Sequence, residues 1–185
     1  EKVPVIIVTI TCNSSGGQPV SMENLKGIRA LANKYGTRVL FDSARFAENA
    51  YFIKIREKGY ENKSVREIVK EMYSYADMAT MSSKKDAIVN MGGFIGMKDE
   101  DLYKEASLYN IMFEGFVTYG GMSGRDMNAL AQGLFEGTEF EYLETRIKQV
   151  AYLGDKLMEY GVPIQHPTGG HAIFVDAKKF LPHVP

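Results

Sequence analysis

Runs of apolar residues alternate along the chain with amphipathic stretches, and this order predicts an α/β fold. The segment from Val3 to Ile10 is rich in β-branched residues and is typical of a strand buried on both faces. The polar, glycine-containing segment 13–19 is expected to leave the sheet as a loop. By the same patterns, further strands are predicted at 38–41, 78–81, 92–97 and 171–176.

Apolar residues at helical spacing predict the intervening helices. The first stripe of this kind is followed by Gly36, a residue that commonly ends helices. Ser64 with Glu67 three residues later has the pattern of a capping box, which opens a helix. Helices are therefore predicted at 22–35, 45–58, 64–72, 99–109 and, with a break near Gly137, 126–160.

Polar residues stand where three of the predicted strands end. Alternating strands and helices favour a mostly parallel sheet with helices on both faces, and ligands of such sheets bind beyond the carboxyl ends of the strands. Asn13, Asp42 and Lys85 are expected at that edge. Taken singly, Asn13 could be a turn residue, Asp42 a helix cap and Lys85 a solvated surface lysine. Their joint placement favours a binding site.

Composition narrows the class of partner. The 185 residues are 45% hydrophobic and 24% charged, which suits one globular domain, or one domain with part of a second. Lysine plus arginine (22) nearly balance aspartate plus glutamate (23), so nothing indicates nucleic-acid binding. The apolar runs are far shorter than the roughly 20 residues that cross a bilayer. We expect small-molecule partners and neither a membrane nor a nucleic acid.

Cysteine and histidine usage points away from disulfide and zinc sites. Cys12 is the single cysteine, so an intramolecular disulfide is excluded, and a reducing cytosol would suit the chain. Cys12 itself has the features of a small buried residue. The three histidines, His166, His171 and His183, are too scattered for zinc spacing.

The polar residues at the strand ends suit the chemistry of pyridoxal phosphate (PLP). That cofactor needs a lysine for a Schiff base, an acid that keeps its pyridine nitrogen protonated, and donors for its phosphate. Lys85 can supply the amine and Asp42 the carboxylate. Ser82 and Lys84 precede the lysine and suit the phosphate, and Arg45 follows the acid closely enough to stand at the rim of the site.

Three segments carry a family resemblance: the loop 13–20, the stretch 41–54 (FDSARFAENAYFIK) and the stretch 81–86 (MSSKKD). They resemble the β-eliminating lyases, the family of tryptophanase and tyrosine phenol-lyase, and the resemblance extends over essentially the whole chain. It implies an aminotransferase-like (fold type I) PLP-dependent large domain. Part of that domain is expected over 1–138, and the start of a small α/β domain over 139–185.

The resemblance also implies roles for single residues. Lys85 matches the lysine that bonds the cofactor and later removes the α-proton of the substrate, and Asp42 matches the partner of the pyridine nitrogen. Asn13 and Arg45 match the pair that holds the cofactor's 3-oxygen. The remaining matches are Ser82 and Lys84, at phosphate-side and rim positions.

Two further residues match family positions near the site. Asn90 matches a residue whose backbone carbonyl helps to bind a monovalent cation such as potassium. Without the family it would be an ordinary turn asparagine. His171 matches a histidine close to the site, although a single histidine beside a strand is more often a packed core residue.

The substrate expected from the resemblance is L-tryptophan, cleaved to indole, pyruvate and ammonia. The stretch 41–46 and Phe116 look like tryptophanase, because the phenol-lyases tend to have threonine before the arginine and methionine in place of Phe116. Val117 departs from the proline usual in both branches. The alternatives are a tyrosine phenol-lyase and, in another class, a scaffold fragment without catalysis.

The family further implies a cytoplasmic homotetramer. The chain looks like a fragment of such an enzyme, since the family's upstream phosphate loop and downstream carboxylate-binding arginine have no counterpart in it. We therefore expect the isolated 185-residue piece to be inactive.

Overall fold

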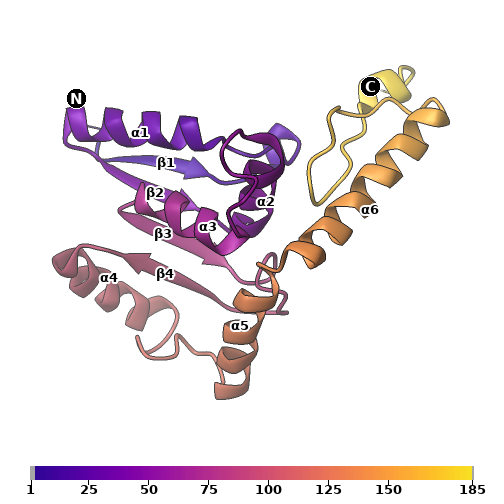
Figure 1. Ribbon diagram of the computed structural model, residues 1–185. Helices are drawn as coiled ribbons and strands as arrows, with labels where there is room; N and C mark the ends of the chain where they lie inside the picture. The colour runs from indigo at the N-terminus through magenta and orange to yellow at the C-terminus, as the bar shows by residue number, and fades with distance from the viewer. Residues whose placement is uncertain (1–2, 185) are drawn as a thin grey trace.

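The computed structural model describes residues 3–184 (Figure 1). In this part of the chain one sheet has the strand order β1-β2-β3-β4. β1, β2 and β3 run parallel, and β4 is antiparallel to β3. The mostly parallel α/β sheet expected from the sequence is confirmed. The strands are β1 (Val5–Thr9), β2 (Arg38–Asp42), β3 (Met78–Ser82) and β4 (Gly93–Met97).

Seven α-helices lie in the described part of the chain, and several begin at caps that the sequence encodes. Ser21 accepts a hydrogen bond from the Asn24 backbone at the start of α1, and Ser64 with Glu67 forms the expected capping box of α3. The helices are α1 (Met22–Tyr35), α2 (Phe46–Arg56), α3 (Val65–Ser74), α4 (Glu100–Phe113), α5 (Gly124–Glu136), α6 (Phe140–Glu159) and α7 (Ala177–Phe180), with a 3₁₀ turn η1 (Asn13–Ser15).

The first three helices cover one face of the sheet. Both parallel connections lead to the next strand in the same direction, and right-handed crossovers then place their helices on the same side. Val39 and Phe41 of β2 are buried on this side. Strand residues of opposite parity point to the second face, where Ile7 is 62% exposed and Ile95 is 59% exposed.

The direction of β4 follows from the length of its connection. Only residues 83–92 separate β3 from β4, and this stretch contains no helix. A parallel strand needs a crossover of about a dozen residues or more, so the short connection leaves an antiparallel pair. The sequence predicted the strand and left its direction open.

The strand predicted at 171–176 is wrong. Instead, an isolated antiparallel bridge pairs Ile164 with Val175, flanked by backbone hydrogen bonds from Gln165 and Asp176. Prolines at positions 163 and 167 lack the N–H that a longer ladder requires, so the pairing stays at one bridge.

The long amphipathic stretch is divided into α5 and α6, as expected near Gly137. Leu143 and Ile147 on the first half of α6 are buried in the same core as α2, where Tyr51 also packs against Phe140. The segment after α6 folds back along that helix toward α2 (Figure 1). The domain division at 138/139 falls between α5 and α6 and stays a prediction. Within residues 3–184, no helix is long and apolar enough to cross a membrane.

Candidate active site

Three sequence-predicted site residues lie at one edge of the sheet. The register pairs Thr9 with Asp42 and Asp42 with Thr80, so β1 and β2 end at the same level and β3 continues for two residues beyond it. Asn13 lies four residues beyond the last residue of β1, and Lys85 lies three beyond the last residue of β3. The structure therefore brings Asn13, Asp42 and Lys85 to the same edge.

The amine of Lys85 is exposed and lies next to a hydroxyl. It donates a hydrogen bond to Ser82 Oγ at 3.2 Å. Lys84 is exposed beside it. The neighbouring Ser83 hydroxyl is buried and has no hydrogen-bond partner among the described residues. An amine and hydroxyl groups thus gather where β3 ends.

Asp42 is the last residue of β2 and is not a helix cap, because Arg45 occupies the N-cap position of α2. The next residue, Ser43, fixes this strand end: its hydroxyl donates to the Thr80 carbonyl (3.0 Å) and accepts from Tyr73 Oη (2.7 Å). Burial raises the pKa of Tyr73 to about 12, so its hydroxyl remains a donor. Asp42 itself is exposed, so a ligand can reach its carboxylate.

Two strained residues flank the site. Thr11 and Ile88 have positive φ angles, 54° and 56°, which cost a β-branched residue about 1–3 kcal/mol. Thr11 is completely buried, and its Oγ1 lies 3.3 Å from both Asn49 Oδ1 and the Arg45 carbonyl. Such strain persists only where surrounding contacts hold it, and it concentrates at functional sites.

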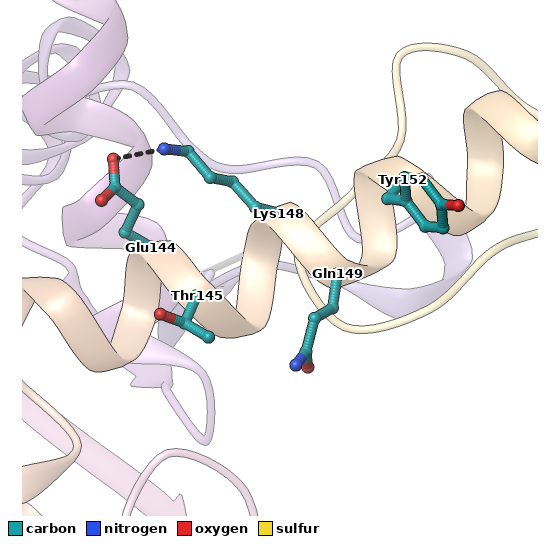
Figure 2. Close-up of a pocket in the computed structure, with 5 residues that line it drawn as sticks. All are labelled: Glu144, Thr145, Lys148, Gln149 and Tyr152. Carbon is teal, nitrogen blue, oxygen red and sulfur yellow. Dashed lines mark ion pairs between the residues drawn. The ribbon is translucent and has the colours of Figure 1, made fainter.

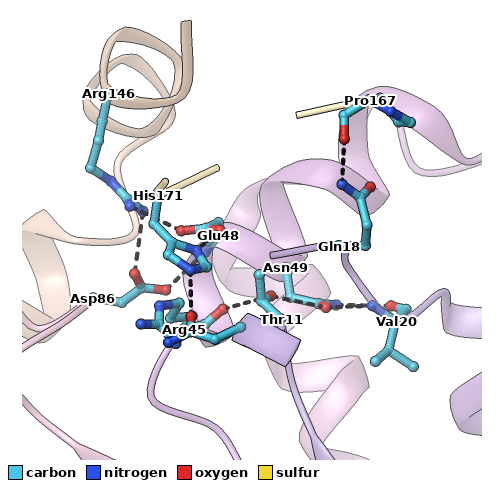
Figure 3. A network of polar contacts seen from close by, with 11 residues as sticks. Thr11, Gln18, Val20, Arg45, Glu48, Asn49, Asp86, Arg146, Pro167 and His171 are labelled. Atoms are coloured by element: carbon cyan, nitrogen blue, oxygen red, sulfur yellow. Dashed lines mark hydrogen bonds and ion pairs between the residues drawn. The ribbon is translucent and has the colours of Figure 1, made fainter. Parts of the chain in front are cut away.

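A chain of polar contacts joins the strand ends to α6 and to the segment after it (Figure 3). Glu48 of α2 is fully buried; its Oε1 lies 2.8 Å from His171 Nδ1, and its Oε2 accepts from Arg146 at 3.0 Å. Arg146 also donates to Asp86 Oδ1 at 3.2 Å, and Asp86 Oδ2 accepts from the Glu48 backbone N–H at 2.9 Å. On its other side, His171 Nε2 lies 2.6 Å from Asn13 Oδ1.

Among the residues of these polar contacts, Asp86 has a pKa that is shifted mainly by burial. Burial raises the pKa of Asp86 to about 6, while the positive charge of Arg146 acts in the opposite direction. Asp86 directly follows Lys85 in the sequence, so these polar contacts reach to within one residue of the lysine that carries the candidate amine.

Glycines let the loop after β1 and the segment 165–171 approach closely. A Cβ at Gly17 would lie 2.8 Å from the His171 ring, and one at Gly169 would lie 2.5 Å from the Gly16 carbonyl. Gln18 Nε2 donates to the Pro167 carbonyl at 2.7 Å. The segment that carries His171 is therefore closely packed against the loop that carries Asn13.

Sequence reasoning missed Glu48, Asp86 and Arg146. One signal was available for Glu48: it lies within the stretch 46–53, where every residue is buried, and a carboxylate inside such a helix needs partners. The partners themselves come from residues 38 and 98 positions further along the chain, which no local pattern connects to it.

The predicted cation site has no direct support in the structure. Asn90 is exposed beyond the Lys85 turn. The described residues form no group of three or more histidine, cysteine, aspartate or glutamate side chains that could hold a metal ion. A potassium site built from carbonyl oxygens would be of another kind, so the assignment of Asn90 stays a prediction.

A hollow on α6 lies outside this constellation (Figure 2). Its walls are side chains of a single helix, with one ion pair between Lys148 Nζ and Glu144 Oε1 at 2.8 Å. Side chains from several elements converge at the strand ends and not here. We therefore place the candidate site at the strand ends.

Solved structures share this fold. A putative L-allo-threonine aldolase from Listeria monocytogenes superposes with a TM-score of 0.66 at 21% identity, over 92% of this chain and 43% of that one. A putative aromatic amino acid β-eliminating lyase/threonine aldolase from Exiguobacterium gives 0.65 at 17% identity, over 89% and 42%. These likenesses show the aminotransferase-like (fold type I) fold expected from the sequence.

The family follows from sequence comparison. The β-eliminating lyase family model matches residues 1–180, and the chain belongs to this family. It is 64% identical over 185 residues to a probable β-eliminating lyase of Trichomonas vaginalis, 53% to a tyrosine phenol-lyase of Fusobacterium nucleatum and 51% to a tryptophanase of Salinibacter ruber. All of this chain is aligned in each case, and it spans about two fifths of each relative (40%, 40% and 39%). Membership of the family implies PLP as cofactor.

Proposed function

We propose that these residues belong to a PLP-dependent carbon–carbon lyase that cleaves an aromatic L-amino acid by β-elimination. Pyruvate, ammonia and the released ring would be its products. The observation that carries the proposal is the position of Asn13, Asp42 and Lys85 at the carboxyl ends of three neighbouring strands in a chain of this family.

The residues at the strand ends fit PLP. An exposed primary amine, an exposed carboxylate and serine hydroxyls are the groups that an aldehyde, a pyridine nitrogen and a phosphate require. When bound, the cofactor supplies a ring that accepts electrons from the substrate's α-carbon.

Each side chain then has a distinct task. Lys85 is the nucleophile toward the cofactor aldehyde and the base that takes the α-proton at its Nζ. Asp42 accepts a hydrogen bond from the pyridine N–H and keeps that nitrogen protonated. Asn13 and Arg45 would donate to the cofactor's 3-oxygen. The hydroxyl of Ser82 would contact the phosphate, with Lys84 at the rim of the site.

The proposal of L-tryptophan as substrate rests on Phe116. Its ring is 54% exposed and stacks on Tyr119 with a centroid distance of 6.5 Å, so an apolar aromatic surface is available to a substrate ring. L-Tyrosine is the second candidate, favoured by relatives named tyrosine phenol-lyase at 52–55% identity. The identities to the two kinds of relative differ too little to separate the substrates.

Other properties of the whole protein are also proposals. We propose a homotetramer in the cytoplasm, with potassium held in part by the Asn90 carbonyl and a small-molecule amino acid as partner. The division into domains at 1–138 and 139–185, and the inactivity of the 185-residue piece alone, belong to the same proposal. Turnover by the full-length protein should therefore be higher in potassium than in sodium buffer.

The test uses the full-length protein with PLP and potassium. Pyruvate release is measured with L-tryptophan and with L-tyrosine, alongside indole and phenol. Lys85→Ala is expected to lose the long-wavelength cofactor absorbance and to lower turnover by about a thousandfold or more, because nucleophile and base are removed together. Lys148→Ala, on the exposed side of α6, is the matched control and should match the wild type.

Several outcomes would contradict the proposal. Normal turnover by Lys85→Ala would refute the assignment of the lysine. Absence of any cofactor band in the full-length wild type would favour the non-catalytic alternative. Release of phenol but no indole would replace L-tryptophan by L-tyrosine.

A further inference from the structure

Both ring nitrogens of His171 face hydrogen-bond acceptors. Nδ1 lies 2.8 Å from a Glu48 carboxylate oxygen, and Nε2 lies 2.6 Å from the amide oxygen of Asn13. Neither a carboxylate oxygen nor an amide oxygen can donate. With Glu48 ionised and the Asn13 amide in this orientation, the two short contacts place a proton on each ring nitrogen, which is the imidazolium form.

The charges around the ring balance in that form. Among the residues that the structure describes, Glu48 of α2 is the only ionisable group within hydrogen-bond reach of the His171 ring. Phe174 packs edge-on against that ring. Through Glu48, the ring is linked to Arg146 of α6, which also binds Asp86. Two cations, His171 and Arg146, then face two carboxylates, and a buried cluster with balanced charges avoids the penalty of an unpaired charge.

The imidazolium has a consequence for Asn13. With its amide oxygen held by the Nε2–H of His171, the amide turns its NH₂ group away from the ring. A neutral imidazole would instead accept from that NH₂ group and leave the amide oxygen for the ligand. An amide oxygen would repel an anionic oxygen, whereas an NH₂ group binds it.

We propose that Glu48 and His171 are positioning residues: Glu48 holds His171 as an imidazolium, and its Nε2–H orients Asn13 to donate to the cofactor's ring oxygen. The part of the inference that concerns the cofactor rests on the proposed function. The close packing of 165–171 on the loop after β1, with Gln18 bound to Pro167, gives the contact its fixed geometry.

Two substitutions of His171 separate positioning from simple packing. The side-chain nitrogen of His171→Gln can occupy the place of Nε2 and donate to Asn13, whereas that of His171→Asn can occupy the place of Nδ1 and donate to Glu48. The dissociation constant of PLP is measured for the apo form of each full-length variant. We expect His171→Asn to weaken binding by about tenfold or more, the loss typical of a hydrogen bond to a charged group, and His171→Gln to stay within about threefold of the wild type.

The same pair should rank in the opposite order in thermal stability. His171→Asn keeps a donor on the buried Glu48 carboxylate, whereas His171→Gln leaves one of its oxygens unpaired. His171→Asn should therefore unfold at the higher temperature while binding PLP more weakly. Equal loss of affinity in both variants, or wild-type affinity in His171→Asn, would refute the positioning role. A wild-type protein that does not bind PLP would refute the proposed function instead.

The protonation state has its own readout, which does not depend on the cofactor. In ¹⁵N-histidine-labelled apo protein at neutral pH, solid-state NMR should show both ring nitrogens of His171 protonated, the signal being assigned by its loss in His171→Gln. In Glu48→Gln the ring should be neutral, with one protonated nitrogen. Glu71→Gln, which removes a carboxylate on α3, is the matched control and should leave the ring protonated. A neutral ring in the wild type, or an unchanged imidazolium in Glu48→Gln, would overturn the inference.

Discussion

At the scale of single residues, the geometry of the site depends on glycines as much as on charged groups. The polar contacts that link Asn13 to Arg146 can form because the backbone of glycine residues, which have no side chain, lies beside them. Gly170 is buried, and a Cβ there would lie 2.6 Å from the carboxyl carbon of Glu48. Unlike the end of a surface side chain, this carboxylate is held by Arg146 and His171 and has nowhere to move.

Gly170→Ala should therefore destabilise the protein by about 1–3 kcal/mol, the range for an added methyl group in a closely packed interior. Gly27→Ala is the matched control, because a Cβ on this helical residue of α1 meets nothing within 4 Å. Relief of the glycine penalty should stabilise that variant by up to about 1 kcal/mol. Urea unfolding measures both, and a Gly170→Ala protein as stable as Gly27→Ala would contradict the packing described.

At the scale of elements, an ion-pair cluster joins α3 to α1 and to the loop between α2 and α3. Glu71 accepts from Lys63 Nζ (2.6 Å) and from Tyr60 Oη (2.8 Å), and Lys26 Nζ of α1 lies 3.2 Å away. Partial burial acts to raise the pKa of Glu71, but these donors outweigh it and lower that pKa to about 2.

Because the folded pKa of Glu71 lies below its ordinary value of 4.5, its contribution to stability is present above about pH 4.5 and is lost as the pH falls toward 2. Glu71→Gln should lower the free energy of unfolding at pH 7 by about 1 kcal/mol, a value reduced for solvent screening. It should also flatten the acid side of the stability profile. Urea unfolding of the wild type and of Glu71→Gln between pH 2.5 and 7 measures the difference. If the two proteins lost stability in parallel as the pH falls, the role given to Glu71 would be wrong.

The sequence allowed most elements to be predicted, because their signals are local. Periodicity placed α1 at its observed bounds, and the serine and glutamate of the capping box marked the start of α3. The strand predicted at 171–176 failed because ladder length depends on the partner segment, where two prolines stand.

The candidate site divides in the same way. Asn13, Asp42 and Lys85 could be placed at one sheet edge from the sequence because each stands at or just beyond the end of its own strand. Glu48, Asp86 and Arg146 could not, because their roles arise only when α2, the turn after β3 and α6 meet. The 3.2 Å contact between Lys85 and Ser82 was not predicted, because the sequence assigned Ser82 to the phosphate and not to the lysine.

At the scale of the whole molecule, the handedness of the crossovers leaves the second face of the sheet with exposed apolar side chains. Ile7 and Ile95 on this face are each more than half exposed, and α4, which contacts β4, also exposes Leu108, Met112 and Phe113. Apolar surface of this extent marks a region that other protein covers, or one that promotes association.

The 185-residue chain, prepared alone, should accordingly bind the dye ANS and self-associate. Ile7→Lys should reduce both, because it places a charge in the exposed face of β1. Ile55→Lys is the control: this residue is 50% exposed but lies on α2, away from that face. Dye fluorescence and light scattering measure the difference, and equal effects of the two substitutions would show that the sheet face is not the source.

The contact between the loop after β1 and the segment 165–171 also sets an order of events during synthesis. Asn13 and Lys85 emerge from the ribosome long before His171, which lies 158 residues beyond Asn13. The early strands and their helices can pack while translation continues, but in the proposed role of His171 the amide of Asn13 gains its orientation only when His171 arrives. A nascent chain halted before residue 165 would hold the candidate lysine and acid in place and still lack the geometry for tight cofactor capture. On this proposal, the site would mature only after synthesis has passed the segment that folds back from α6.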